Sequence, residues 1–367
     1  MLNKKKIVLV YPSMHAGGVP KRVVLFASIL KESGHNVLIV CKKGSLLKKI
    51  EKNEIDYYLF PHNFQEKENI FKELFVYLKA FIKIFLKLKK EKPNLIVNHS
   101  RYTSVFVKIL SKTLHLKYYS VAHGSYSGFS LLKKWVWGEK ILAVSNTTKL
   151  NLINNYQLPP QKIQVIKNSI KPLKHPTEKE KNNFIEEFNL RNKTIISTIT
   201  RFDTIKNVLM TIKSWELIYK KERNTVLLII GHGPLEDEIN KYIIKAGISE
   251  RTLVINNIID VSVVVSLSSF LILTSSREGL PSVVLEAFSL GKPVLATDVI
   301  GTNEIIKNNY NGLLVPLNDY KKLAELMENF IHDEILLNRL SKGAKDTYFK
   351  EFSFDKYRKQ ILNFFES

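Results

Sequence analysis

The sequence has one cysteine, Cys41, in 367 residues. A single cysteine cannot form an internal disulfide, so a small secreted fold held together by disulfides is excluded. One cysteine and nine scattered histidines also lack the paired ligand spacing that zinc sites require. We therefore expect a protein of a reducing compartment with no bound metal.

Long hydrophobic runs are also missing. The longest apolar stretch, residues 261–274, contains four serines and is too short to cross a bilayer. Residues 1–6 are basic, but the apolar run 7–11 that follows is only one strand long and ends at Pro12, unlike a secretory signal. These absences favour a cytoplasmic protein, with peripheral attachment to the inner face of the cell membrane as an open alternative.

Acidic residues are scarce relative to basic ones. The chain has 34 Asp and Glu residues against 56 Lys and Arg residues, which gives a net charge of +22. So large an excess predicts an anionic partner such as nucleic acid, acidic lipid or a phosphorylated ligand. Because the lysines are spread along the whole chain, a general compositional bias explains them equally well. The remaining composition is that of an ordinary globular protein, and the length favours two domains.

Short apolar runs alternate with amphipathic segments, a pattern typical of parallel, doubly wound α/β sheets. A polar stretch with two prolines, residues 171–181, separates two such series. We therefore expect two Rossmann-like domains, residues 1–170 and 171–349. The expected strands are 6–11, 36–41, 95–97, 118–122, 140–144 and 164–166 in the first series and 194–200, 225–230, 253–255, 270–273, 293–296 and 312–315 in the second. The clearest expected helices are 19–33, 70–90, 282–290 and 320–330.

Two glycines, Gly17 and Gly18, lie between the first expected strand and the first expected helix. Glycine lets the backbone approach an anion closely, and a helix N-terminus offers it free N–H groups. The same pair suits any tight turn between a strand and a helix, and the G-x-G-x-x-G pattern of dinucleotide-binding oxidoreductases is absent. The segment is a candidate phosphate-binding turn with a purely structural alternative.

Two carboxylates, Glu278 and Glu286, follow the expected strand 270–273. Pro281 suits the first turn of a helix and Gly291 the position just past its end. Glu278 is then expected in the loop and Glu286 about a turn inside the helix. Both would lie at the carboxyl edge of the sheet, where open α/β sheets bind ligands, and could accept hydrogen bonds from sugar hydroxyls. The alternative is a solvated Glu278 and a Glu286 that stabilises its own helix.

The E-x7-E spacing of Glu278 and Glu286, with its surroundings, resembles the retaining glycosyltransferases of family 4, also called group 1, which have the GT-B fold. The likeness covers nearly the whole chain and is more specific than any one of its parts. It includes Gly17-Gly18-Val19, Gly34-His35-Asn36-Val37, Val144-Ser145, Asn168, the run G-K-P-V-L-A-T-D from Gly291, Glu304 and the run N-G-L-L-V from Asn311.

The resemblance implies roles for individual residues. Arg201 and Lys206 match the paired basic residues of the family, which would neutralise a diphosphate leaving group as charge develops on it. Glu278 would bind the sugar hydroxyls and Glu286 the ribose. His123 would lie near the reacting centre. The donor-binding residues implied in the same way are Gly17, Gly18, Gly231, Gly233, Leu280, Pro281 and Ser282.

The resemblance also implies an architecture and a reaction. Two Rossmann-like domains would face each other across a cleft, with residues 350–367 returning to the N-terminal domain. The enzyme would move a sugar, with retention of configuration, from a nucleoside-diphosphate donor to a hydroxyl of a glycan or lipid-linked acceptor in cell-surface polysaccharide synthesis. No metal, cofactor or nucleic acid would take part. Two alternatives stay open: a nucleotide-sugar epimerase of similar fold, and a non-enzymatic protein that binds nucleic acid or an anionic surface.

The expected helix from Ile70 to Lys90 has a separate pattern. At helical spacing its lysines at 72, 79, 83, 87 and 90 fall on one narrow face, and apolar residues fill much of the remainder. One interpretation is a helix packed on its sheet with a solvated lysine face. The other is a helix that binds an anionic membrane, because aromatic side chains beside lysines suit the headgroup region.

Overall fold

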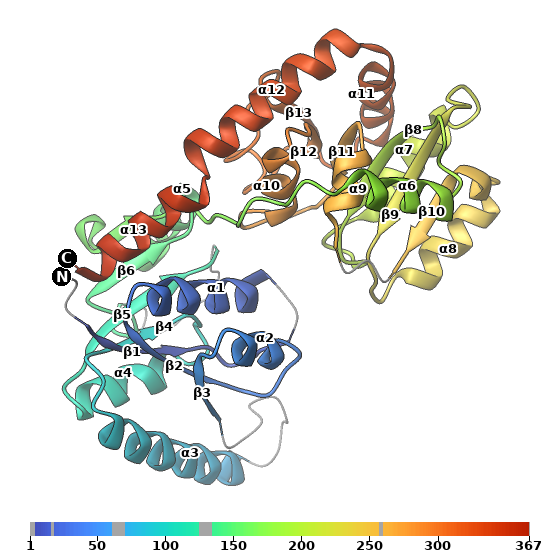
Figure 1. Cartoon of the computed structure of the whole chain (residues 1–367). Helices are drawn as coiled ribbons and strands as arrows, with labels where there is room; N and C mark the ends of the chain where they lie inside the picture. Colours follow the sequence, from blue (N-terminus) through green and yellow to red (C-terminus); the bar gives the residue numbers. More distant parts are fainter. Residues whose placement is uncertain (1–3, 16–17, 61–69, 125–133, 257–259, 367) are drawn as a thin grey trace. The chain divides into compact units, whose positions relative to one another are not determined.

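The computed structural model describes residues 4–15, 18–60, 70–124, 134–256 and 260–366, and for residues 70–77 it describes the backbone alone. The chain divides into two compact units, the first comprising Met1–Lys167 with Arg358–Ser367 and the second Asn168–Tyr357. Each unit is a parallel sheet with helices on both faces (Figure 1). The expected doubly wound α/β architecture is therefore confirmed.

The first unit has a seven-stranded sheet in the order β3-β2-β1-β4-β5-β6-β7. Its central strands are runs of buried Val, Ile and Leu, as expected for parallel strands covered on both faces. The strands are β1 (Lys6–Val10), β2 (Asn36–Cys41), β3 (Asp56–Leu59), β4 (Leu95–Asn98), β5 (Lys117–Ala122), β6 (Lys140–Ala143) and β7 (Ile163–Val165). The helices are α1 (Gly18–Glu32), α2 (Leu47–Lys52), α3 (Ile70–Glu91), α4 (Ser104–Thr113) and α5 (Asn146–Tyr156).

Helices α3 and α4 cover one face of this sheet, and α1 with the last helix, α13 (Phe354–Glu366), covers the other (Figure 1). The rings of Phe26 on α1 and Phe365 on α13 lie 5.4 Å apart, edge to face. Lys5 Nζ donates a hydrogen bond to the Phe365 carbonyl oxygen at 2.5 Å. The end of the chain thus returns to the first unit, but from Arg358 rather than from residue 350 as expected, because α12 extends to Glu351 and Phe352 is buried in the core of the second unit.

The second unit has a six-stranded sheet in the order β10-β9-β8-β11-β12-β13. The strands are β8 (Thr194–Ile199), β9 (Thr225–Ile230), β10 (Thr252–Ile255), β11 (Phe270–Leu273), β12 (Val294–Thr297) and β13 (Gly312–Val315). The helices are α6 (Glu178–Glu187), α7 (Val208–Ile218), α8 (Glu236–Lys245), α9 (Ser262–Leu267), α10 (Ser282–Ser289), α11 (Tyr320–His332) and α12 (Glu334–Glu351). Helices α7, α8 and α11 pack on one face and α6, α9 and α10 on the other, while α12 contributes Leu340 to the first core and Ala344 and Tyr348 to the second.

The structure departs from the expected elements in two places. Strand β3 was not expected; it is four residues long, lies at the edge of its sheet and is only partly buried. Pro281 does not lie in the first turn of α10 but precedes it with extended backbone, φ −68° and ψ 116°. Gly291 does follow the helix end, with the positive φ of 70° typical of that position.

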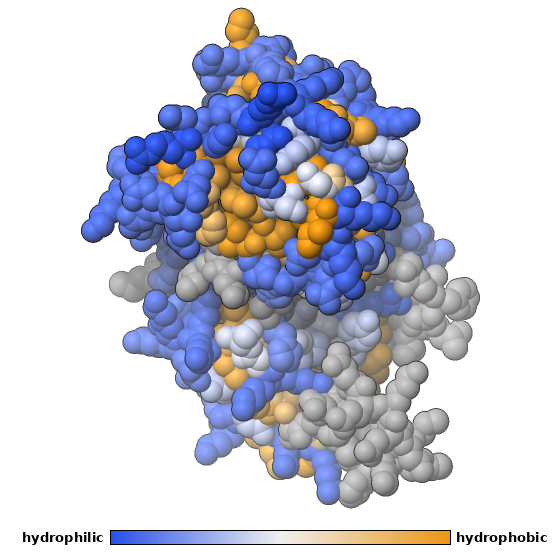
Figure 2. Space-filling view, turned by 90° about the vertical axis from the view of Figure 1, so that its right-hand side faces the viewer, coloured by the Kyte–Doolittle hydropathy of each residue, from blue (hydrophilic) through white to orange (hydrophobic). Residues whose placement is uncertain are grey.

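The surface of the second unit is mostly hydrophilic on the side of α8 and β10, but a compact hydrophobic area interrupts it (Figure 2). On this side β10 is the edge strand, and its Leu253, Val254 and Ile255 are half-buried.

Among the helices within the described ranges, none combines the length and the apolar character needed to cross a membrane.

Candidate active site

The expected donor-binding residues of the second unit gather at one edge of its sheet. Strand β8 lies between β9 and β11, so the connections that leave β8 and β11 diverge at their carboxyl ends. Such a switch point is where open α/β sheets bind ligands. The backbone N–H of Ser276, after β11, donates to the carbonyl oxygen of Ile205, after β8, at 2.7 Å. The two loops are therefore held side by side.

Lys206 and Glu278 join these loops by an ion pair. Lys206 Nζ lies 2.5 Å from Glu278 Oε1, and the Ser275 hydroxyl donates to the same oxygen at 2.6 Å. The Glu278 side chain is 9% exposed and that of Lys206 26%. A carboxylate so far from water is stable only with such partners. The pair, which has no net charge, places an ammonium donor beside carboxylate acceptors at the switch point.

Arg201, which follows β8, is arranged differently. Its side chain is 64% exposed, and its Nε donates to Asp203 Oδ2 at 2.6 Å. Asp203 Oδ1 accepts a hydrogen bond from the backbone N–H of Lys206 at 2.9 Å. Burial alone would raise the pKa of Asp203, but the hydrogen bonds from Lys206 and Arg201 outweigh burial and lower it. Asp203, which sequence reasoning missed, thus pairs with the Arg201 guanidinium and also holds the backbone of Lys206.

Gly231 and Gly233 follow β9 and pack against this loop. A Cβ on Gly231 would lie 1.8 Å from the carbonyl oxygen of Thr200, and one on Gly233 would lie 2.4 Å from that of Phe202. The Phe202 N–H donates to the His232 carbonyl oxygen at 3.0 Å. The observed role of the two glycines is therefore to let the turn after β9 support the backbone that carries Arg201.

A third loop, after β12, supports Glu278 from the other side. The Glu278 N–H donates to the Ile300 carbonyl oxygen at 3.3 Å, and a Cβ on Gly301 would lie 2.7 Å from the Glu278 carbonyl oxygen. The Thr297 hydroxyl donates to the carbonyl oxygen of Ser275 at 2.5 Å. These supports, which sequence reasoning missed, hold the Glu278 loop from its backbone.

The remaining predicted residues of this unit lead into α10. Leu280 and Pro281 are buried, and Ser282 is the first helical residue. Glu286 is half-buried and lies about a turn inside the helix, as expected. The first amides of a helix lack intrahelical acceptors and favour an anion. The start of α10 therefore adds positive potential beside the Glu278 loop.

The predicted residues of the first unit also lie at the carboxyl edge of their sheet. Gly18 begins α1, after β1, and His123 directly follows β5. Gly17 lies outside the described residues. His99, which directly follows β4 and was not predicted, has Nδ1 3.1 Å from His123 Nε2. The backbone N–H of His99 donates to the carbonyl oxygen of Val10, at the end of β1. The histidine pair therefore also lies at a switch point, between β1 and β4.

Burial keeps both histidines neutral. It lowers the pKa of His99 to about 3. The pKa of His123 is lowered well below its usual value, first by burial and then by its electrostatic interactions with His99 and with the Arg22 guanidinium. In a hydrogen bond between two neutral imidazoles, one ring donates and the other accepts. The tautomer of His123 is therefore coupled to that of His99.

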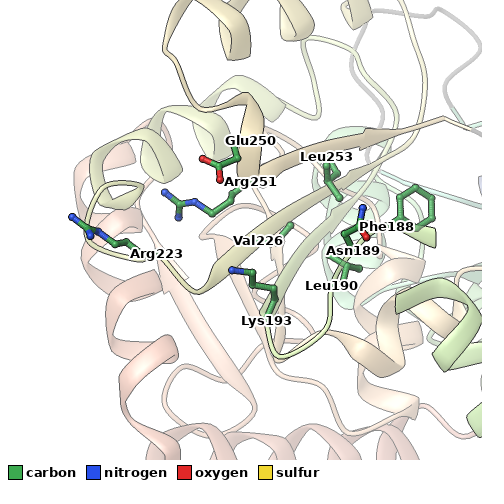
Figure 3. Close-up of a pocket in the computed structure, with 9 residues that line it drawn as sticks. All are labelled: Phe188, Asn189, Leu190, Lys193, Arg223, Val226, Glu250, Arg251 and Leu253. Atoms are coloured by element: carbon green, nitrogen blue, oxygen red, sulfur yellow. The ribbon is translucent and has the colours of Figure 1, made fainter. Parts of the chain in front are cut away.

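A pocket of about 520 Å³ lies elsewhere, at the opposite edge of the second sheet (Figure 3). Its residues precede the strands rather than follow them: Lys193 precedes β8, Arg223 precedes β9 and Arg251 precedes β10. Arg251 donates to the carbonyl oxygen of Tyr219 at 2.7 Å, and its guanidinium lies 3.7 Å from the centre of the Tyr219 ring. This pocket contains none of the predicted site residues.

Two family models match the chain, one for each unit. Residues 178–347 match "Glycosyl transferases group 1", and residues 16–172 match "Glycosyltransferase Family 4". Among curated relatives, the UDP-Gal:alpha-D-GlcNAc-diphosphoundecaprenol alpha-1,3-galactosyltransferase of Escherichia coli is 24% identical, covering 96% of this chain and 94% of the relative. The capsular polysaccharide biosynthesis glycosyltransferase CapM of Staphylococcus aureus is 26% identical, covering 88% of each chain.

Solved structures share the fold over the whole length. A glycosyltransferase from Rickettsia africae ESF-5 superposes with a TM-score of 0.88 at 23% identity, covering 99% of this chain and 98% of the other. Anabaena Alr3699/HepE, solved with UDP and glucose, superposes with a TM-score of 0.83 at 18% identity, covering 99% and 100%. With a family match in each unit and these neighbours for the fold, the chain belongs to the group 1 glycosyltransferases and has the GT-B fold.

Proposed function

We propose that this enzyme is a retaining glycosyltransferase that moves a sugar from a nucleoside-diphosphate donor to a hydroxyl of a glycan or lipid-linked acceptor. The observation that carries the proposal is the cluster of Arg201, Lys206 and Glu278 at the switch point of the second sheet. Two cations suit a diphosphate, and a buried carboxylate beside them suits the hydroxyls of the attached sugar. The E. coli relative, named for UDP-galactose and an undecaprenol-linked acceptor, supports this donor and acceptor class.

The proposed reaction exchanges one bond to the anomeric carbon for another. The bond between that carbon and the diphosphate oxygen breaks, the acceptor oxygen bonds to the carbon, and the acceptor proton leaves with the diphosphate or to solvent. Arg201 and Lys206 stabilise the negative charge that grows on the departing diphosphate. In this proposal Glu278 orients the sugar and Glu286 binds the ribose. The charges on the chain replace a metal ion, and no covalent enzyme intermediate forms.

The first unit supplies the acceptor side in this proposal, with His123 near the reacting centre and Gly17 and Gly18 near the phosphates. A neutral His123 can donate to a sugar hydroxyl or accept from one, but it cannot act as a cationic acid. Cell-surface polysaccharide synthesis is the proposed setting, supported by the relative from S. aureus that is named for capsular polysaccharide biosynthesis.

The test uses purified full-length protein and a panel of nucleotide sugars, beginning with uridine diphosphate sugars. Thermal shift selects the donor, because a tight ligand raises the apparent Tm. The selected donor is then incubated with and without a lipid-linked saccharide acceptor, and NMR identifies the anomer formed. A product with the donor's anomeric configuration supports the proposal. Inversion overturns retention alone, whereas a changed sugar without acceptor indicates an epimerase.

A further inference from the structure

Helices α3 and α4 lie side by side on one face of the first sheet (Figure 1). On the inner side of α3, Ala80, Ile84 and Leu88 are buried. The ring of Phe81 on α3 lies 5.5 Å from that of Phe106 on α4, edge to face. The two helices therefore form one continuous outer surface.

The outer side of α3 is apolar where a solvated helix would be polar. Leu78, Ile82 and Leu86 are 55%, 47% and 57% exposed. Residues spaced by four positions lie on the same side of a helix, so the three side chains form one row. On α4, Val105 and Ile109 have the same spacing and are also exposed. Burial in the fold accounts for neither row.

Exposed lysines border these rows. Lys79 and Lys83 each follow a residue of the α3 row by one position, and Lys90 lies on the same side near the helix end. In the last turn of α4, exposed Lys112 places its Nζ 5.4 Å from the ring centre of Trp135. From residue 78 to residue 90 of α3, and throughout α4, no residue is acidic. The surface thus combines aliphatic side chains with charge of a single sign.

We propose that this surface docks on an anionic lipid bilayer. The α3–α4 surface, as we call it, consists of Leu78, Ile82, Leu86, Val105, Ile109 and the four lysines Lys79, Lys83, Lys90 and Lys112. Aliphatic side chains enter the boundary between headgroups and acyl chains, while lysines around them contact anionic headgroups. A lipid-linked acceptor would lie in the same bilayer, but the docking does not depend on the proposed reaction.

The chemistry favours a bilayer over other occupants. A second copy of the chain would bring two lysine borders together, and like charges repel. Nucleic acid would meet the lysines but would find aliphatic rows rather than aromatic side chains on which bases stack. A bilayer matches both components at once, because it is anionic at the headgroups and apolar just beneath them.

The test is co-sedimentation of the full-length protein with vesicles of phosphatidylcholine containing 40% phosphatidylglycerol, without donor or acceptor. We expect binding at low salt that falls at least tenfold at high salt, and no binding to pure phosphatidylcholine. The triple variant Lys79→Glu, Lys83→Glu, Lys90→Glu should lose at least tenfold in vesicle affinity. Lys87 is left unchanged because its Nζ pairs with Glu91 at 2.8 Å.

A matched control separates the surface from net charge. The triple variant Lys213→Glu, Lys241→Glu, Lys245→Glu makes the same charge change at exposed lysines of the second unit and should bind vesicles nearly as wild type does. Equal losses in both triple variants would overturn the proposal. So would wild-type protein that stays in the supernatant at low salt.

A second variant tests the apolar row. Leu78→Ser, Ile82→Ser, Leu86→Ser changes only exposed side chains, so the Tm should stay near the wild-type value, and vesicle binding should fall at least tenfold. If this serine variant unfolds, the two lysine variants test the proposal without it. Light scattering that shows a wild-type dimer, made monomeric by the same variant, would instead identify a self-association surface and overturn the proposal.

Discussion

Lys206 Nζ lies 2.5 Å from Glu278 Oε1, although the two residues are 72 positions apart in the sequence. The pair connects the loop after β8 to the loop after β11 at the point where the sheet order reverses. A bound diphosphate would compete with Glu278 for the same ammonium group. Lys206 thus couples the position proposed for the phosphates to the position proposed for the sugar.

Arg201→Ala and Lys206→Ala should each lower kcat/KM by about a hundredfold or more, because each removes a charge that stabilises the departing diphosphate. The double variant should lose less transition-state stabilisation than the sum of the two single losses, because both side chains act on one diphosphate. Steady-state kinetics on the four proteins measure this. Lys213→Ala, at an exposed lysine of α7, is the control and should be close to wild type. Full additivity with an effect on KM alone would contradict the shared role.

Glu278→Gln and Glu286→Gln should separate the sugar from the nucleotide. Glu286→Gln should weaken binding of both the sugar donor and the bare nucleoside diphosphate, because the ribose is common to the two ligands. Glu278→Gln should weaken binding of the sugar donor much more than binding of the bare nucleoside diphosphate. Calorimetric titration of both ligands into both variants tests the assignment, and the reverse pattern would show that the two roles are exchanged.

Gly231→Ala should displace the loop that carries Arg201, because the new Cβ would lie 1.8 Å from the Thr200 carbonyl oxygen. Such overpacking costs about 2 kcal/mol or more, and for a unit of this size that lowers Tm by about 4–8 °C. Activity should fall with it. Gly247→Ala is the comparison variant: its φ of +66° is also positive, although that of Gly231 is +150°, and a Cβ on Gly247 meets no atom within 4 Å. A Tm loss for Gly231→Ala no larger than that for Gly247→Ala would contradict the close approach to Thr200 as the reason for the glycine.

Acid should destabilise the protein through His99 and His123. Their pKa values are lowered in the folded state, to about 3 for His99, while an unfolded histidine titrates near its usual 6.5. Below pH 6.5 the unfolded chain therefore binds more protons, and stability falls as the pH drops toward 3. Each histidine contributes up to about 1.4 kcal/mol per pH unit. Tm measured from pH 7.5 to 4.5 should fall less steeply for His99→Gln than for wild type; parallel curves would contradict the assignment.

Chelation should leave the proposed transfer activity intact. Arg201, Lys206 and the start of α10 supply positive charge for the diphosphate, so the reaction should not require a divalent cation. Activity measured after dialysis against EDTA should stay within about twofold of the untreated enzyme, as expected when no Lewis acid contributes several kcal/mol to the transition state. A loss of tenfold or more that magnesium or manganese restores would show that a metal carries part of the charge.

The sequence alone predicted most of the fold, because buried parallel strands are unbroken apolar runs and the helices between them are amphipathic. Helix α3 begins at the expected residue and ends one position beyond the expected one. Strand β3 was not predicted, because its residues lie at an edge of the sheet and are only partly buried, so they do not form an apolar run. The predicted site residues were found by their spacing and by resemblance, which identify side chains but not their contacts.

Only the tertiary structure decided how those side chains are held. No motif in the sequence pointed to Asp203 or His99. Each nevertheless lies just after a strand, as Arg201 and His123 do. Their partners are fixed by which strands are neighbours: β4 beside β5 brings His99 to His123, and β8 beside β11 brings Lys206 to Glu278. The same holds for α3, where periodicity identified the apolar residues but packing decided that Ile84 is buried and Ile82 is not. Local patterns determine which elements form, whereas strand order and packing determine which residues meet.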